Sequence, residues 1–294
     1  MRSIGLACAF VFTAGMVLDA QWINLRTPGL PRLPNGQPDL TAPAPRGADG
    51  KPDFSGLWQN DGGDRYYNNA AIDLPREDVA PWAHALFVKR LREFSKDSMD
   101  TLCLPLGPAY LTSRYRERRI VQTPTLIMMA WDDGHHREIF LDGRSLEPDP
   151  NPTWMGYSVG HWEGDVLVVE SNGYTDRSWL DNGGHPHSDG LRITERYRRI
   201  DVGHIDVQVS MVDPAVYAQP ITFTMPMALR PDTEMLEGVC ENHRNSDARL
   251  SPVLGFWRSV RHCSRGPTRQ SSTATVDSAR PVSGRRAVNA TEIP

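Results

Sequence analysis

The loop from Tyr174 to Asp189, with the sequence YTDRSWLDNGGHPHSD, concentrates side chains that can carry out acid–base chemistry. Pro186 extends the backbone between two histidines, so we expect both imidazoles to point to the same side. Imidazole and carboxylate groups exchange protons near neutral pH. Together with a glutamate that follows the loop, this region predicts a catalytic set of His185, His187, Asp181, Glu195 and Asp189.

Glu195 lies on the apolar face of a predicted strand. Leu191, Ile193 and Tyr197 alternate with polar residues and share the face of Glu195, because successive side chains in a strand point to opposite sides. A carboxylate that faces a core needs a partner or becomes neutral. We expect Glu195 and Asp181 to orient the two histidines, the proton carriers, or to act as bases.

A second polar set lies on the segment REIFLDGR, residues 137–144. Its arginines could pair with an inward carboxylate, Glu195 or Asp181, and stabilise a developing anion. The alternative is a structural salt bridge. Aromatic residues of the same region belong mostly to the core, but some could line an apolar pocket. The predicted substrate-binding residues are Arg137, Asp142, Arg144, Trp154, Tyr157, Trp179 and Tyr197.

Other kinds of site have weaker support. His185 and His187 form an HxH pair that could bind zinc together with Asp or Glu, but such a pair alone is a weak signal. A Gly- and Asp-rich surface loop without function is a further alternative. The sequence contains no phosphate-binding loop, nucleophile elbow, HExxH or CxxCH motif. We expect no cofactor and no metal.

The elements that must position these residues are mainly β-strands. Short polar turns with Gly or Pro separate paired strand segments, which is the signal of β-hairpins. Residues 54–58 predict a first strand and residues 75–95 a helix. The fold class is mainly β: an antiparallel, hairpin-built barrel, lipocalin-like, with one N-terminal helix. The four predicted hairpins pair 119–131 with 138–141, 157–162 with 166–170, 191–200 with 205–212, and 221–229 with 235–240.

Composition sets the boundaries of this unit. Residues 1–20 resemble a signal peptide whose apolar run is too short for a membrane span, and an uncleaved anchor is the alternative. Residues 21–52 are a Pro-rich linker, 53–265 the barrel domain and 266–294 a disordered tail. The net charge of −4 argues against nucleic acid as a partner.

Removal of the leader leaves Cys103, Cys240 and Cys263, which permit one disulfide and one free thiol. Two pairings, Cys103–Cys240 and Cys240–Cys263, are compatible with the sequence. No CxxC spacing indicates zinc or redox chemistry.

Several motifs together resemble a large family of exported bacterial proteins without an established activity. These are PDFSGLW (52–58), CLPLGP (103–108), REIFLDGR (137–144), DPNPTWMGYSVGHWEGDVLVVES (149–171), WLDNGGHPHSD (179–189), ITERYRR (193–199), VDPAVYAQP (212–220) and MLEGVCEN (235–242). The resemblance favours Cys103–Cys240 as the disulfide. Asp189 stands where the family usually has Glu, and Arg192 where it often has His. Gly56-Leu57-Trp58 also looks like the early GxW of lipocalin-like barrels.

The sequence therefore predicts an exported, periplasmic barrel that binds a small apolar organic molecule. We expect it to transform that molecule by hydration, isomerisation, elimination as a lyase, or hydrolysis. The alternatives are a non-catalytic carrier and a zinc-dependent hydrolase that uses the HxH pair. We expect no nucleic acid partner and no stable membrane span once the leader is removed.

Overall fold

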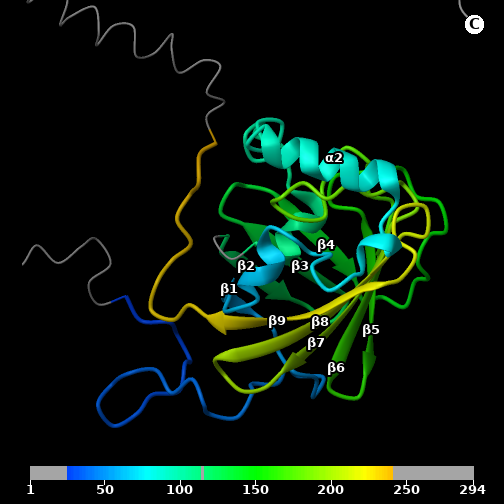
Figure 1. The fold of residues 1–294 in the computed structure, drawn as a ribbon. Coiled ribbons are helices and arrows are strands. Elements are labelled where there is room, and N and C mark those ends of the chain that lie inside the picture. Colours follow the sequence, from blue (N-terminus) through cyan, green and yellow to red (C-terminus); the bar gives the residue numbers. More distant parts are fainter. Residues whose placement is uncertain (1–24, 114–115, 241–294) are drawn as a thin grey trace, which may run out of the picture. The chain divides into compact units, whose positions relative to one another are not determined.

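The computed structural model describes residues 25–113 and 116–240. The predictions for the signal peptide, the tail and Cys263 fall outside these residues. Within them, nine strands follow one another in chain order and close into a barrel (Figure 1). The predicted fold class, a mainly β barrel built from hairpins, is confirmed. In this part of the chain no helix has the length and apolar character needed to cross a membrane.

The barrel closes because its last strand pairs with its first, with Trp58 opposite Leu229. Neighbouring strands are antiparallel except for one parallel pairing, in which Phe140 faces Val159. The strands are β1 Gly56–Asn60, β2 Arg118–Gln122, β3 Leu126–Trp131, β4 His136–Phe140, β5 Tyr157–Glu163, β6 Val166–Asn172, β7 Arg192–Arg199, β8 His204–Val212 and β9 Ile221–Leu229.

Two of the four predicted hairpins match observed strand pairs, β5 with β6 and β7 with β8. A third, 119–131 with 138–141, matches in part, because β3 pairs with β4. The segment 119–131 is not one strand, because it turns at Thr123 and continues as β3. Pro124 cannot donate a hydrogen bond to a ladder, which favours this break. Residues 235–240 form no strand, since β1 already occupies the edge of β9 to which they were assigned.

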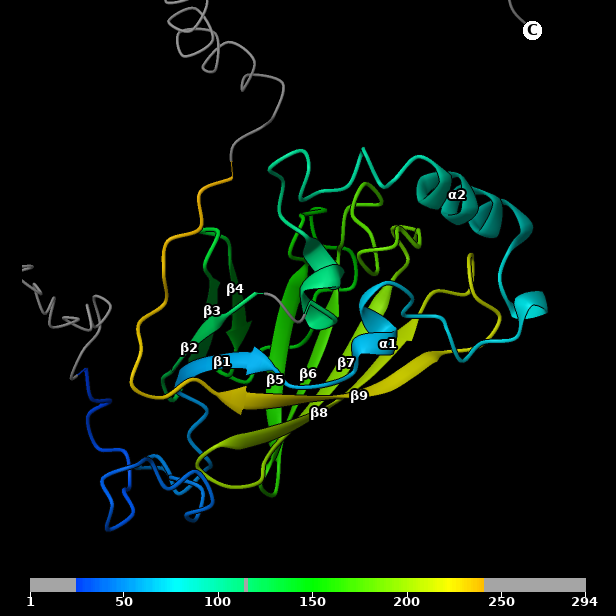
Figure 2. The same ribbon diagram turned by 60° about the vertical axis from the view of Figure 1, so that its left-hand side comes forward.

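The predicted helix over 75–95 is shorter in the structure. A 3₁₀ turn, Arg76–Asp78, precedes the helix α2, Pro81–Arg92, whose first residue is a proline. A shorter helix, α1, spans Asp64–Tyr67, and a 3₁₀ helix spans Gly107–Leu111. Figure 2 shows α2 and the segment that follows it over one end of the barrel. We call this end the mouth of the barrel.

The barrel interior is filled by side chains. Alternate residues of the strands point inward, and the largest of these are almost completely buried. Aromatic residues from the flanking segments add to the same core. Side chains thus occupy the space that a wider barrel would leave for a ligand. The largest buried residues include Trp58, Trp131, Tyr110, Tyr197, Phe54 and Arg118.

Residues 25–52 do not form the extended linker that was predicted. A motif, P-R-x-x-[ND]-G-[QK]-P-D, occurs at 31–39 and again at 45–53. Each copy closes a small turn in which the arginine pairs with the second proline, Arg32 with Pro38 and Arg46 with Pro52. In each copy the same arginine also donates to the carbonyl of the motif glycine.

Both turns are attached to the barrel. Arg32 forms an ion pair of 2.6 Å with Asp232, which follows β9. Arg46 forms one of 2.5 Å with Asp165, in the turn between β5 and β6. The proline content of the segment indicated an extended linker, whereas these paired charges hold it against strand ends that are remote in sequence.

Candidate functional site

Asp181 and His185 form a buried pair at the mouth of the barrel. His185 Nδ1 lies 2.6 Å from the Asp181 carboxylate. The same carboxylate accepts the backbone N–H groups of Ala70, at 2.7 Å, and Gly184, at 2.9 Å. The His185 ring stacks on Phe87 of α2, with 3.6 Å between ring centroids. Asp181 thereby connects three segments, and its hydrogen bonds account for its burial.

His187 has a different partner, Ser178, which sequence reasoning did not single out. His187 Nε2 lies 2.8 Å from Ser178 Oγ, and Nδ1 lies 2.8 Å from the carbonyl oxygen of Ser188. A carbonyl only accepts, so Nδ1 donates and Nε2 of the neutral ring accepts the Ser178 hydroxyl. Burial lowers the pKa of His187 and favours this neutral ring.

The Ser178–His187 pair is covered by protein. Ser178 is 0 % exposed and His187 is 3 % exposed. The Ser178 hydroxyl is also 3.0 Å from the carbonyl of Thr175, which competes for its proton. Gly107 packs against Ser178 so closely that an added Cβ would lie 2.9 Å from Ser178 Cβ. The pair has the geometry of a hydroxyl beside a base, in a position that solvent does not reach.

Glu195 points into the barrel, as the strand alternation predicted, and is 0 % exposed. Its carboxylate lies 2.5 Å from Arg137 Nη2 and accepts the Tyr197 hydroxyl at 2.5 Å. Arg137 also donates to the hydroxyls of Ser158 and Ser171. Burial acts to lower the pKa of Arg137, but the adjacent Glu195 carboxylate outweighs it and holds that pKa above its ordinary value. The expected Arg137–Glu195 pairing is present.

The remaining predicted residues lie elsewhere. Arg144 is exposed and forms a 2.6 Å ion pair with Asp142, whose pKa this bond lowers. Its guanidinium also covers Phe140 and comes within 3.4 Å of the Tyr157 hydroxyl. Trp154 contacts the guanidinium of Arg177. Asp189 is exposed. The catalytic set is therefore divided between two buried pairs at the mouth, one pair inside the barrel and an exposed aspartate.

A cavity of about 300 Å³, which we call the mouth pocket, lies beside Asp181 of the Asp181–His185 pair. It collects two of the predicted residues, Trp179 and Asp181. Its apolar wall comes from Met99, Leu106 and Trp179, and its polar wall from Asp100, Arg116 and Asn182. Trp179 is held in place by Arg90 of α2, whose guanidinium carbon lies 4.4 Å from the centroid of the indole.

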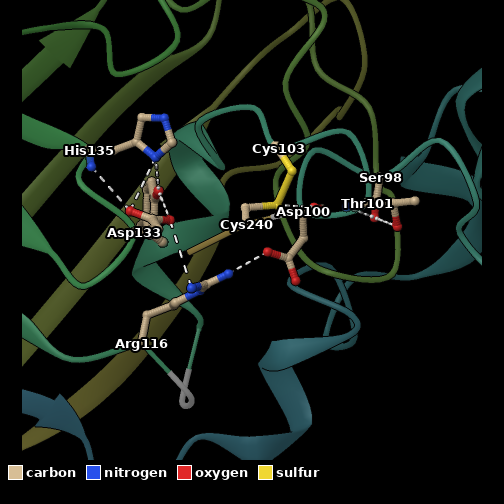
Figure 3. The surroundings of a disulfide bond; sticks show 9 residues. Ser98, Asp100, Thr101, Cys103, Arg116, Asp133, His135 and Cys240 are labelled. Atoms are coloured by element: carbon tan, nitrogen blue, oxygen red, sulfur yellow. Dashed lines mark hydrogen bonds and ion pairs between the residues drawn. A yellow bond between two sulfur atoms is a disulfide. The ribbon is translucent and has the colours of Figure 1, made fainter. Parts of the chain in front are cut away.

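The surroundings of the polar wall carry more negative than positive charge, because Arg116 also contacts two carboxylates that lie outside the pocket lining. Arg116 pairs with Asp100 and contacts Asp132 at 3.4 Å and Asp133 at 4.0 Å. Figure 3 shows Arg116 between Asp100 and Asp133, with His135 beside Asp133. Burial raises the pKa of Asp132. One guanidinium thus faces three carboxylates from two separate segments.

A disulfide fixes this wall. Cys103 and Cys240 are bonded, as the family resemblance implied, across a separation of 137 residues. Cys240 Sγ also lies 3.4 Å from the carbonyl oxygen of Asp100, next to the polar wall (Figure 3). The motif CLPLGP was the available signal for this region, since it holds both Cys103 and Leu106. Its spacing did not reveal that it borders a pocket.

The potential zinc ligands are separated by their partners. His185 is bonded to Asp181, whereas His187 is bonded to Ser178 and Ser188. In residues 25–113 and 116–240, no three His, Cys, Asp or Glu side chains are arranged to hold a metal ion.

Comparison with known proteins adds little to this description. No family model matches the chain, and no curated protein matches it. The resemblance to exported bacterial proteins therefore stays a prediction. Among solved structures, the fluorescent protein UnaG is similar at 16 % sequence identity and a TM-score of 0.30. That alignment covers 60 % of this chain and 96 % of UnaG.

Proposed function

We propose that this protein binds a small, partly apolar organic molecule in the mouth pocket. The observation that carries the proposal is the pocket itself, a cavity of about 300 Å³ lined by apolar side chains and by an ion pair. Small-molecule sites in proteins combine an apolar lining with a few fixed polar groups and begin at about this volume. The barrel interior offers less, since large side chains fill it.

The walls indicate what the ligand looks like. A flat or compact apolar part would pack against Trp179, Met99 and Leu106. A hydroxyl or amide could donate to Asp100 and accept from Arg116, and a cationic group would be favoured by the excess of carboxylates. The disulfide and the Arg90–Trp179 contact hold these walls in position, which reduces the entropy lost on binding.

The proposal can be tested by ligand-observed NMR with a library of small aromatic and aliphatic alcohols, amides and amines. Ala109 lines the pocket and is buried, so Ala109→Leu places three additional carbons in the cavity. We expect this variant to lose the binding that the wild type shows and to remain folded. Ala85→Leu, on the exposed surface of α2, is the matched control and should bind normally.

The polar wall gives a second test. Asp100→Asn keeps the shape of the side chain and removes its charge. A hydrogen bond to a charged group contributes about 1.5–3 kcal/mol, so amine and alcohol ligands should bind roughly 10- to 150-fold more weakly. Unchanged binding by both variants would place the site elsewhere and contradict the proposal.

Acid–base catalysis is a second candidate, and the Ser178–His187 pair is the observation that favours it. Its ring tautomer leaves Nε2 free to accept the hydroxyl proton, as a general base requires. The pair lies beyond Gly107 from the pocket wall formed by Leu106 and Ala109, so substrate contact requires that wall to open.

A ligand identified by NMR would be incubated with wild-type protein and followed by mass spectrometry. Turnover that Ser178→Ala and His187→Gln both abolish would support catalysis. Turnover by both variants at the wild-type rate would contradict catalysis by this pair.

Export to the periplasm is part of the same proposal and rests on the leader-like residues 1–20. The disulfide agrees with an oxidising compartment. Fractionation of cells that express the full chain, with N-terminal sequencing of the product, should find a periplasmic protein that begins near residue 21. An intact N-terminus in the cytoplasm would contradict export.

A further inference from the structure

Three side chains form one row inside the barrel. Trp58 of β1 lies opposite Arg118 of β2, and Arg118 lies opposite Trp131 of β3. Directly opposed residues in antiparallel strands project from the same face of a sheet. Trp58 is 0 % exposed, and Arg118 and Trp131 are each 2 % exposed, so the row faces the interior. The Arg118 guanidinium thus lies in the core between two tryptophans.

No carboxylate in the described part of the chain pairs with the charge of Arg118. Arginine keeps its proton in proteins, so the guanidinium is a buried cation. Its hydrogen-bond partner is the neutral amide of Asn60, with 2.5 Å from Nη2 to Oδ1. Glu195 lies in the same interior but is bound by Arg137 and Tyr197. Among the described strands, the inward-facing residues therefore place three guanidiniums, those of Arg118, Arg137 and Arg199, against the one carboxylate of Glu195.

The side-chain amide of Asn60 cannot flip to present another group to Arg118. Its amide nitrogen donates to the carbonyls of Leu111, at 3.0 Å, and Ser113, at 2.9 Å. These two acceptors fix the amide so that its oxygen faces Arg118. Burial lowers the pKa of Arg118, as expected for a cation without a counter-ion of its own.

Two donors of the row lack an acceptor within the described protein. They are Arg118 Nε and Trp131 Nε1, both buried. The indole of Trp58, in contrast, donates to the carbonyl of Phe54 at 2.9 Å. A buried donor without an acceptor is costly, and one on a cation is more so. The two groups are neighbours across the β2–β3 ladder, and the guanidinium carbon lies 5.9 Å from the Trp131 ring centroid.

We propose that Arg118 and Trp131 form a binding site for a small monovalent anion inside the barrel. Such an anion accepts an N–H group from the guanidinium and another from the indole, and it balances the unmatched charge. Ile120 and Met129 are buried at the next inward-facing positions of β2 and β3 and limit the space beside Arg118 and Trp131. The site therefore suits a halide or formate rather than a long carboxylic acid. This inference is independent of ligand binding in the mouth pocket.

Bromide is the probe, because it scatters anomalously and replaces chloride. Crystals of the full, oxidised chain grown with sodium bromide should show an anomalous peak within hydrogen-bonding distance of Arg118 Nε and Trp131 Nε1. In solution, the thermal midpoint should rise with bromide and saturate when sodium gluconate keeps the ionic strength constant. A ligand that binds the native state and not the unfolded state raises the thermal midpoint with its concentration in this way.

Variants separate the site from general salt effects. Trp131→Phe removes one donor and should raise the bromide concentration needed for half the effect several-fold. Arg118→Met should abolish the effect. Arg119→Met is the matched control, since it removes the same charge from the adjacent, outward-facing position, where Arg119 pairs with Glu234, and it should respond like the wild type.

A water molecule between Arg118 and Trp131 in bromide crystals, with no anomalous peak and a midpoint independent of the anion, would overturn the proposal. If Arg118→Met does not fold, Trp131→Phe decides alone, and an unchanged bromide dependence in that variant would exclude the site.

Discussion

The pair of Arg137 and Glu195 gives the sharpest test of what the inward carboxylate does. Arg137→Met removes the guanidinium and leaves Glu195, which is 0 % exposed, with the Tyr197 hydroxyl as its remaining side-chain donor. Breaking a buried ion pair by removing one partner costs about 3–5 kcal/mol, because the other charge remains in a medium of low polarity. We expect a loss of that size at neutral pH.

Replacing both partners should cost much less. In Arg137→Met/Glu195→Leu no buried charge of the pair remains, and apolar replacements of buried ion pairs are often neutral in stability. Glu195→Leu alone strands Arg137 and should cost about 3–5 kcal/mol as well. The double variant should therefore be several kcal/mol more stable than the sum of the single losses implies.

Urea denaturation with the disulfide intact, followed by tryptophan fluorescence, measures each free energy of unfolding. Glu195→Gln serves as a second measurement, since it keeps an acceptor for Arg137 and Tyr197. A loss below about 1 kcal/mol for Arg137→Met, or single losses that simply add, would refute the view that Glu195 is a structural carboxylate whose charge depends on Arg137.

Three further predictions concern the mouth. Burial holds the pKa of His187 in the folded state below its ordinary value of 6.5. Below about pH 6.5 the unfolded state therefore binds more protons than the folded state, and the free energy of unfolding should fall as the pH drops through that value. His187→Gln should weaken that dependence in urea titrations at pH 5 to 8, and identical profiles would contradict it. In Gly107→Ala the new Cβ would lie 2.7 Å from the Trp154 carbonyl oxygen, on a residue at φ +61°. We expect the free energy of unfolding, measured by calorimetry, to fall by at least about 2 kcal/mol. The control is Gly134→Ala, at an exposed position with φ +83° and no atom within 4 Å, and it should cost less. Reduction of the Cys103–Cys240 disulfide opens a loop of 137 residues. Chain entropy allows this reduction to lower the free energy of unfolding by up to about 5 kcal/mol. A thermal midpoint that does not change with reductant would show that the disulfide does not stabilise the fold.

Local patterns predicted the barrel well. The two-residue alternation of 191–199 placed Glu195 inward and Arg192 and Arg196 outward, as observed. Polar turns located the hairpins of β5–β6 and β7–β8. The pattern misled at 235–240, where it indicated a strand, because the alternation of a segment does not say whether a partner edge is still free.

The candidate site was predicted only in part. Asp181, His185 and His187 do gather at the mouth, but each histidine has its own buried partner. Ser178 was missed because it lies in an irregular loop, where no periodicity relates it to His187. The segments 31–39 and 45–53 fold into two similar turns, whereas the proline content had predicted an extended chain.

The sequence by itself determined most of the strand segments, the face of Glu195 and the concentration of acid–base residues in one loop. These are local properties, set by side chains two or four positions apart. Only the tertiary structure decided that Arg137 neutralises Glu195, that Arg118 and Trp131 are neighbours without acceptors, and that Met99 and Trp179 share a pocket. Those contacts depend on strand register and on how the loops pack at the mouth, which bring together segments that are apart in sequence and leave no periodic trace in the chain.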